Sequence, residues 1–345
     1  MLRAFRRPAL GVFLILLAAS TLKAETVPLP DGLDRRIIQG IDDVFSMEFD
    51  ASAKQYDLAI EEFPEHPYGY FGKAATEWLR YMYATEQSQT GFVKVFEKNV
   101  DLAYQKSQSW LAAHPGDAHI LLGLGGIYGL KSRWSMVQWH WISAYLNGRK
   151  AIQYIRRAQE ADAGLYDAYL GVGMYDYYSD SLPRAIKILS KILLIRGDRE
   201  RGLEEIRMAA DKGHFTKIAA KLVLIEIYTE DLWGGKNPKE AVRLVAEVRQ
   251  KYPASPLWMS TEIVCLYEAG DFNALLPAAL AYLEAVKAHW QKYHEAMLSK
   301  AHVAVGTAYW ALGKKEHAMA AFRDGDPGRA TSGRPSVEAS HPETV

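Results

Sequence analysis

Apolar residues recur at intervals of three and four positions along almost the whole chain, from Leu33 to Phe322. The stretches AIQYIRRA and EAVRLVAEV show this spacing clearly, whereas strict alternation of apolar and polar residues is scarce. Intervals of three and four place apolar side chains on one face of an α-helix, while alternation would place them on one face of a strand. The pattern therefore predicts an all-α protein.

Two glycine-rich stretches follow apolar runs and raise the question of a phosphate-binding loop. They are ILLGLGGIYGL, from Ile120, and YLGVGMYDYY, from Tyr169. A nucleotide-binding loop needs a preceding strand and glycines at fixed offsets. The pattern predicts no strand before either stretch, and Tyr128 stands where the third glycine of the dinucleotide motif belongs. We interpret the glycines as positions where two helices approach closely.

The glycines also belong to a repeated pattern. Its clearest copy is VGTAYWALGKKEHAMAAF, in which Gly306 and Tyr309 are followed by Ala318 and Phe322. Weaker copies occur at Leu124, Gly125 and Tyr128, and at Tyr169, Val172 and Gly173. This pattern resembles the tetratricopeptide repeat (TPR), which is a helical hairpin. The stretch YDAYLGVGMYDYYSDSLPRAIKILSKILLIRGDRERGLEEI also resembles eukaryotic TPR proteins linked to inclusion-body clearance. The resemblance implies a TPR-like helical-hairpin solenoid that forms a right-handed superhelix.

The N-terminal repeats are longer than a standard TPR. Their predicted ends, at Pro64, Pro115, Ala163 and His214, lie 51, 48 and 51 residues apart, against about 34 in the family. The extra residues fall between the first and second helix of each repeat. They are the segments TEQSQTGFVKVFEKN, KSRWSMVQWHWISAY and SDSLPRAIKILSKILLIRGD. We therefore predict an additional short helix in each of these three connections.

These features divide the chain into four expected parts. Residues 1–24 form a signal peptide, 25–214 the N-terminal TPR-like repeats with inserted helices, 215–323 the C-terminal TPR-like repeats, and 324–345 a disordered tail rich in Gly, Pro and Ser. The signal assignment rests on basic residues before residue 8, an apolar run over 10–19 and a small residue at position 24. An uncleaved membrane anchor is the alternative. We expect an exported protein that is periplasmic or associated with the outer membrane.

Charge and motifs narrow the function classes. The whole chain has 41 basic and 41 acidic residues, and residues 1–24 hold four of the basic ones and no acid, which leaves 37 against 41. An acidic excess argues against a nucleic-acid partner. The HEAML stretch has Leu298 in place of the second histidine of a zinc-protease motif, and Cys265 lies in a helical apolar pattern that favours a buried thiol. We therefore expect no metal, no cofactor and no catalytic activity.

In the TPR family the concave face of the superhelix comes mainly from the first helices. The residues that the resemblance places there are Tyr68, Phe71, Trp78, His119, Asp167, Met174, Tyr177, Tyr178, Tyr228 and Trp310. An aromatic and apolar groove suits an apolar helix or an extended peptide of a partner protein. We therefore predict a non-enzymatic protein-interaction scaffold of the cell envelope. The same side chains are also suited to the core between repeats, and this alternative stays open.

Two other functions remain as alternatives. An α/α toroid that binds or processes carbohydrate would need inward carboxylates, for which Asp167, Asp176 and Asp180 are the candidates. A peripheral membrane protein would use the basic amphipathic helix expected over residues 183–195. Its cations include Arg184, Lys187 and Lys191, and its apolar residues include Ile188, Ile192 and Ile195. Such a helix also suits packing on its own protein, with its cations in water.

Overall fold

A computed structural model of the protein describes residues 27–83, 91–180, 197–230, 235–289 and 295–326. All regular structure in these ranges is helical, which confirms the predicted all-α class. The helices are α1 (Asp31–Phe45), α2 (Phe49–Glu62), α3 (Pro67–Tyr83), α4 (Val93–Ala113), α5 (Ala118–Val137), α6 (Trp141–Ala161), α7 (Asp167–Asp180), α9 (Arg199–Lys212), α10 (Lys217–Glu230), α11 (Pro238–Lys251), α12 (Pro256–Glu268), α13 (Phe272–Ala288), α14 (Glu295–Ala311) and α15 (Lys315–Asp324).

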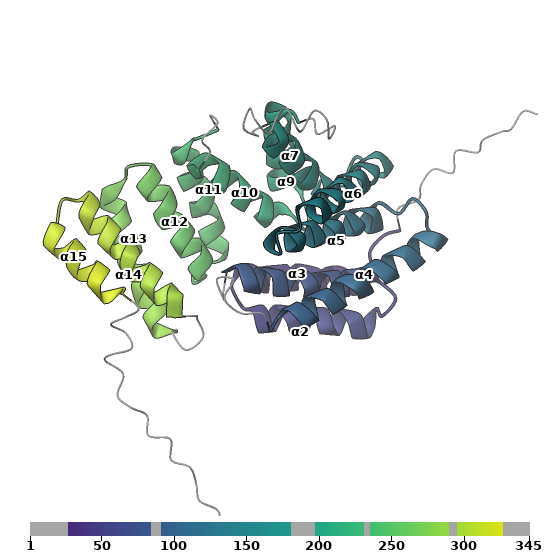
Figure 1. The fold of residues 1–345 in the computed structure, drawn as a ribbon, viewed down its shortest axis with the longest axis horizontal. Helices are drawn as coiled ribbons and strands as arrows, with labels where there is room; N and C mark the ends of the chain where they lie inside the picture. The colour runs from purple at the N-terminus through teal and green to yellow at the C-terminus, as the bar shows by residue number, and fades with distance from the viewer. Residues whose placement is uncertain (1–26, 84–90, 181–196, 231–234, 290–294, 327–345) are drawn as a thin grey trace, which may run out of the picture.

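The described helices pack as successive hairpins. The pairs are α1–α2, α3–α4, α5–α6, α7–α9, α10–α11, α12–α13 and α14–α15. The second helix of each pair also packs against the first helix of the next pair, so that the hairpins stack in chain order. Figure 1 shows this stack running from α2 and α4 at one end to α15 at the other. The chain is a helical solenoid, as predicted.

The glycines of the repeated pattern lie where the two helices of a hairpin touch. A Cβ atom added to Gly125 would lie 2.3 Å from a side-chain carbon of Ile155 on α6. On Gly306 it would lie 2.4 Å from the ring of Phe322 on α15. Real side chains do not approach this closely, so glycine sets the distance between the paired helices. The interpretation of these residues as packing positions is confirmed.

The predicted inserted helices are wrong in the parts of the first two connections that the structure describes. Residues 91–92 form a turn and residues 93–99 are already the start of α4. In the second connection, α5 continues to Val137 and α6 begins at Trp141. Packing explains the longer helices, because the ring of Trp134 on α5 lies 5.6 Å from the ring of Phe92 and 5.9 Å from that of Phe96. The predicted helix over residues 183–195 lies outside the described residues.

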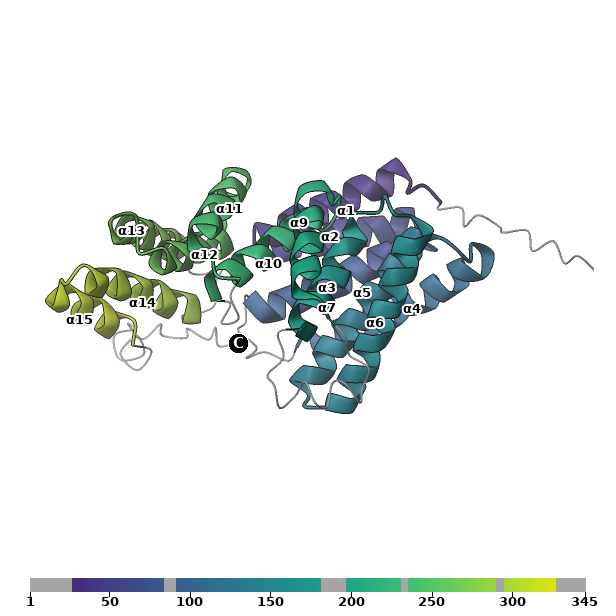
Figure 2. The ribbon, with the colours of Figure 1, turned by 90° about the horizontal axis from the view of Figure 1, so that it is seen from above.

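The solenoid coils tightly enough to bring its first hairpin against its second half. The ring of Phe45, at the end of α1, lies 5.8 Å from the ring of Trp258 on α12. The Ser255 hydroxyl donates a 2.7 Å hydrogen bond to the carbonyl of Phe45, and both Lys251 and Tyr252 donate 2.6 Å bonds to Asp42. Figure 2 shows α1 and α11 on the same, upper side of the molecule. N-terminal residues therefore help to build sites in the C-terminal half.

Residues 1–26 and 327–345, which include the expected signal peptide and tail, lie outside the described residues. Within the described ranges, no helix combines the length and the apolar character needed to cross a bilayer.

Candidate functional site

The structure buries five of the ten predicted groove residues inside the packed solenoid. The buried ones are Tyr68, Trp78, Asp167, Tyr177 and Tyr228; Phe71, His119 and Met174 are half-buried, and Tyr178 and Trp310 are exposed. The tight coil explains this outcome, because elements of later hairpins cover the face that we expected to be open. The Tyr68 hydroxyl, for example, donates a 2.5 Å hydrogen bond to the carbonyl of His119, and its ring packs edge-on against Phe215. The buried residues stabilise the fold and do not form a groove.

The carboxylates considered for a toroidal enzyme have structural partners. Asp167 accepts 2.8 Å hydrogen bonds from the backbone N–H groups of Phe215 and Thr216, which fixes the start of α10 against α7. The fully buried Asp176 accepts a 2.9 Å bond from Nε of Arg201 on α9. Because α15 lies at the far end of the stack from α2 and α4, the described helices form an open solenoid (Figure 1). The described helices therefore do not close into the ring of a toroid, and Asp167 and Asp176 serve contacts between helices.

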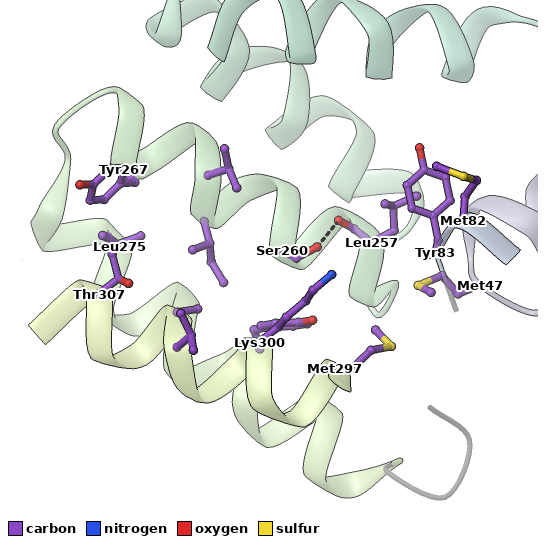
Figure 3. A pocket seen from close by; sticks show the side chains of 15 residues that line it. Met47, Met82, Tyr83, Leu257, Ser260, Tyr267, Leu275, Met297, Lys300 and Thr307 are labelled. Carbon is purple, nitrogen blue, oxygen red and sulfur yellow. Dashed lines mark hydrogen bonds between the residues drawn. The ribbon is translucent and has the colours of Figure 1, made fainter. Parts of the chain in front are cut away.

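An apolar groove lies instead between the first helices of the last two hairpins (Figure 3). Helices α12 and α14 each contribute five lining residues, at positions forty residues apart. The pairs are Leu257 and Met297, Ser260 and Lys300, Ile263 and Val303, Val264 and Ala304, and Tyr267 and Thr307. This register shows that the groove is a property of the repeat and not an accident of one loop. Its cavity volume is about 360 Å³.

The other walls of the groove come from α13 and from the N-terminal hairpins. Leu275 and Tyr282 of α13 form its buried floor, while Met47, Met82 and Tyr83 close one end (Figure 3). Burial raises the pKa of Tyr83 to about 12, so its phenol stays protonated at neutral pH. The return of the chain upon itself is what brings these three residues to the groove.

The chemistry of the groove suits apolar side chains. Lys300 is the one charged side chain among the lining residues, and none of them is an acid, a histidine or a cysteine. Val264, Tyr267 and Val303 remain 43 %, 45 % and 46 % exposed, which is high for large apolar residues on packed helices. Methionine adapts its shape to different partners, and three methionines line this groove. The arrangement offers a large apolar contact area.

Tyr178 lines a second cavity, of about 640 Å³, between α6 and the end of α7. Its lining includes Met136 and Trp141, which belong to the turn region between α5 and α6. In the parts of the chain that the structure describes, no group of three or more His, Cys, Asp or Glu side chains suits a metal ion.

Comparison with known proteins agrees with this architecture. Residues 168–310 match the family model described as Iml2/Tetratricopeptide repeat protein 39. Over these residues the chain is similar to that family of TPR proteins. The match runs from α7 into α14 and so includes both helices of the apolar groove. TPR-type repeats generally mediate protein–protein interactions. No curated protein matches the sequence.

Two solved structures are also similar to this TPR-like chain. One is a tetratricopeptide repeat protein from Parabacteroides merdae, at 14 % identity, with 89 % of this chain and 95 % of that chain covered and a TM-score of 0.34. The other is the TPR domain of P58(IPK), at 11 % identity, with 88 % and 99 % covered and a TM-score of 0.19.

The sequence patterns missed most of the groove. The family register pointed to the first helices, and this candidate groove does lie between two of them, but the prediction emphasised aromatic residues of the N-terminal repeats. The forty-residue register between α12 and α14 was readable from the sequence, since Ile263 and Val303 occupy equivalent places. By contrast, nothing in the sequence indicated that Met47, Met82 and Tyr83 would reach the same groove.

Proposed function

We propose that this TPR-like protein binds an apolar helix or extended peptide of a partner protein in the groove between α12 and α14. The observation that carries the proposal is the register of five equivalent positions on each helix, which line one largely apolar groove. Partner helices that bind such grooves insert apolar side chains at intervals of three, four and seven residues. The exposed apolar area of Val264, Tyr267 and Val303 would be removed from water on binding, at about 25 cal/mol per Å².

A peptide-display experiment tests this proposal. A library of helical and extended peptides is selected on the purified full-length chain, and the recovered peptides are measured by fluorescence anisotropy. The variant carrying Val264→Asp and Val303→Asp places two charges in the groove at exposed positions, so that the fold remains intact. We expect the selected peptides to carry regularly spaced apolar anchors and to lose at least about tenfold in affinity for this variant.

The matched control is Met319→Asp, which changes an exposed apolar residue of α15 that does not line the groove. Its affinity should equal that of the wild type. Selected peptides that bind the wild type, the groove variant and the control equally would show that the groove is not the binding site.

We further propose that the interaction takes place in the cell envelope. The basic start of the chain followed by an apolar run supports export. The test is expression of the full chain in a Gram-negative host, followed by fractionation and sequencing of the N-terminus. A periplasmic or outer-membrane protein that begins at Glu25 is the expected result, and an uncut protein in the cytosolic fraction would contradict it.

A further inference from the structure

The turn between α5 and α6 exposes an unusual group of large apolar side chains. The group, here called the α5–α6 tip, consists of Met136, Trp139, Trp141, Ile142 and Leu146. Trp139 and Ile142 are 75 % and 78 % exposed, the highest values among the exposed large apolar residues of the described chain. Helices α5 and α6 meet at this turn at the lower edge of the molecule in Figure 2, away from α1 and α9. The tip is a projecting apolar surface.

The fold does not require a large side chain at Trp139, because other hairpin turns with the same backbone have glycine at the equivalent position. Four hairpin turns share one pattern, in which a residue with positive φ follows the first helix and two backbone hydrogen bonds close the turn. Gly270 and Gly313 occupy this position in the last two hairpins, with φ of 73° and 74°. Glycine is the residue that favours this left-handed conformation. Met47 and Trp139 occupy it with φ of 61°.

The two non-glycine residues differ in what their side chains do. Met47 is buried and packs in the core with Phe49 and Met259, so its contacts compensate for the unfavourable backbone. Trp139 contacts the ring of Trp141 edge-on at 5.4 Å and otherwise points a large indole into water. A bulky residue in a left-handed conformation is an outlier, and such outliers concentrate at functional positions. The turn therefore holds an indole outward at a cost to folding.

The charge of this hairpin limits what the tip can contact. Between Asp117 and Glu160 the sequence has six Lys or Arg residues and no Asp or Glu. Two of these cations face acids on neighbouring helices, since Lys131 lies 3.2 Å from Asp101 and Arg156 lies 3.6 Å from Asp176. The remaining four are Arg133, Arg149, Lys150 and Arg157, and none of these forms an ion pair with another described residue. Arg133 lies near Glu226, whose pKa it lowers against the effect of burial.

We propose that the α5–α6 tip inserts into the interface of an anionic lipid membrane. Indole rings favour the headgroup region of a bilayer, and Ile and Leu side chains favour the acyl boundary beneath it. Arg149 and Lys150 follow Trp141 on α6 by eight and nine residues, which is about 12–14 Å along the helix axis. When the indoles lie in the interface, these long side chains reach the lipid phosphates. The tip is apolar and exposed, and behind it lie Arg149 and Lys150, which form no ion pair within the described residues; an anionic membrane suits both features.

This membrane contact is independent of the apolar groove between α12 and α14. It also uses different residues from the expected helix over 183–195. A sugar ligand would stack on the tryptophans, but Ile142 and Leu146 would offer it no hydrogen bonds. The anionic membrane is therefore the partner that accounts for the indoles, the aliphatic residues and the charge together.

A site-specific fluorescent reporter tests the proposal in the full-length chain. Cys265 is the only cysteine and is fully buried, so a second cysteine at an exposed position can be labelled selectively. Ile142→Cys and, as control, Met319→Cys on α15 are each labelled with an environment-sensitive nitrobenzoxadiazole dye. The labelled proteins are titrated with phosphatidylcholine vesicles, with and without phosphatidylglycerol. Because the dye reports its own surroundings, binding through residues 1–24 does not mimic insertion of the tip.

We expect a blue shift and an intensity gain at position 142 with anionic vesicles, and no change at position 319. Trp139→Gly suits the turn and should weaken the response. The double variant with Arg149→Gln and Lys150→Gln should bind anionic vesicles about 30-fold more weakly, because each cation near an anionic surface contributes about a fivefold factor in affinity. The groove variant with Val264→Asp and Val303→Asp should respond as the parent does.

Two results would overturn the proposal. The first is an unchanged dye at position 142 with anionic vesicles, whether or not the protein sediments with them. The second is a shift produced by soluble oligosaccharides and not by vesicles, which would assign the tip to carbohydrate.

Discussion

The contact between α7 and α9 allows a sharp test of how the repeat packs. A Cβ atom added to Gly173 of α7 would lie 2.7 Å from the backbone oxygen of Gly202 and 2.9 Å from the backbone nitrogen of Ile206, both on α9. Backbone atoms cannot rotate away as a side chain can. Gly173→Ala must therefore push the two helices apart by about 0.7 Å to restore ordinary contact distances of 3.4 Å or more.

The magnitude follows from two opposing effects. Overpacking in a well-packed core costs about 1–3 kcal/mol, and the upper end applies here because two backbone atoms obstruct the new methyl group. Replacing glycine by alanine within a helix stabilises it by about 1 kcal/mol. The net expectation for Gly173→Ala is a loss of about 2 kcal/mol in the free energy of unfolding. The buried neighbours Tyr177 and Ile206, which lie in the same core, would loosen with it.

Gly129→Ala provides the matched control. Gly129 lies within α5, and no atom outside its own helix comes within 4 Å of an added Cβ. This variant should gain about 1 kcal/mol, so the two substitutions should differ by about 3 kcal/mol. The assay is urea denaturation followed by circular dichroism at equal protein concentration. If Gly173→Ala were as stable as Gly129→Ala, the close helix contact, and with it the explanation of the glycine pattern, would be refuted.

Three further predictions concern single side chains. Arg201→Ala leaves the fully buried Asp176 without its nearest cation and should lower the free energy of unfolding by about 3 kcal/mol, the low end for a buried pair because the guanidinium is half exposed. Adding Asp176→Asn should restore most of this loss in urea denaturation. A double variant as unstable as Arg201→Ala would contradict this explanation. Burial, together with Asp176, raises the pKa of Glu205 from 4.5 to about 7, so the folded state binds this proton more tightly than the unfolded chain and stability falls as the pH rises from 4.5 through 7. Glu205→Gln should therefore raise the melting temperature more at pH 8 than at pH 5, and parallel pH profiles would exclude this carboxyl as the cause. Trp139→Gly should leave the free energy of unfolding unchanged or raise it by up to about 1 kcal/mol, because the cost of the left-handed backbone for tryptophan is larger than the entropic cost of ordering a glycine. A clear fall in the melting temperature would show that the indole stabilises the fold.

The return of α1 to the second half of the solenoid links the two ends of the chain. Phe45 packs with Tyr252 and Trp258, while Met47 and Tyr83 contribute to the groove between α12 and α14. The N-terminal hairpins therefore shape the proposed binding site as well as extending the repeat. A fragment that contains only the last hairpins would lack one end of the groove.

Local patterns in the sequence determined the secondary structure and the pairing of helices. The spacing of apolar residues identified helices because the helical period is a property of each short segment. The glycines at 125, 173 and 306 identified the helix contacts because a close approach within one hairpin needs only residues near in sequence. The inserted helices were wrong for a related reason. The number of residues in a repeat does not reveal whether the extra residues form a new helix or lengthen the two existing helices. Here the ring contacts of Trp134 with Phe92 and Phe96 stabilise longer helices.

The location of the candidate site depended on tertiary structure. The first helices were predicted to carry it, and the candidate groove lies between two first helices. The coil buries Tyr68 and Tyr177 while leaving Val264 and Val303 accessible. Whether a first-helix residue is covered depends on the curvature of the whole stack and on contacts between residues such as Asp42 and Lys251, which lie 209 positions apart. Each hairpin is specified by its own sequence. The curvature of the solenoid is the sum of small rotations between neighbouring hairpins, so no single segment of the sequence determines it.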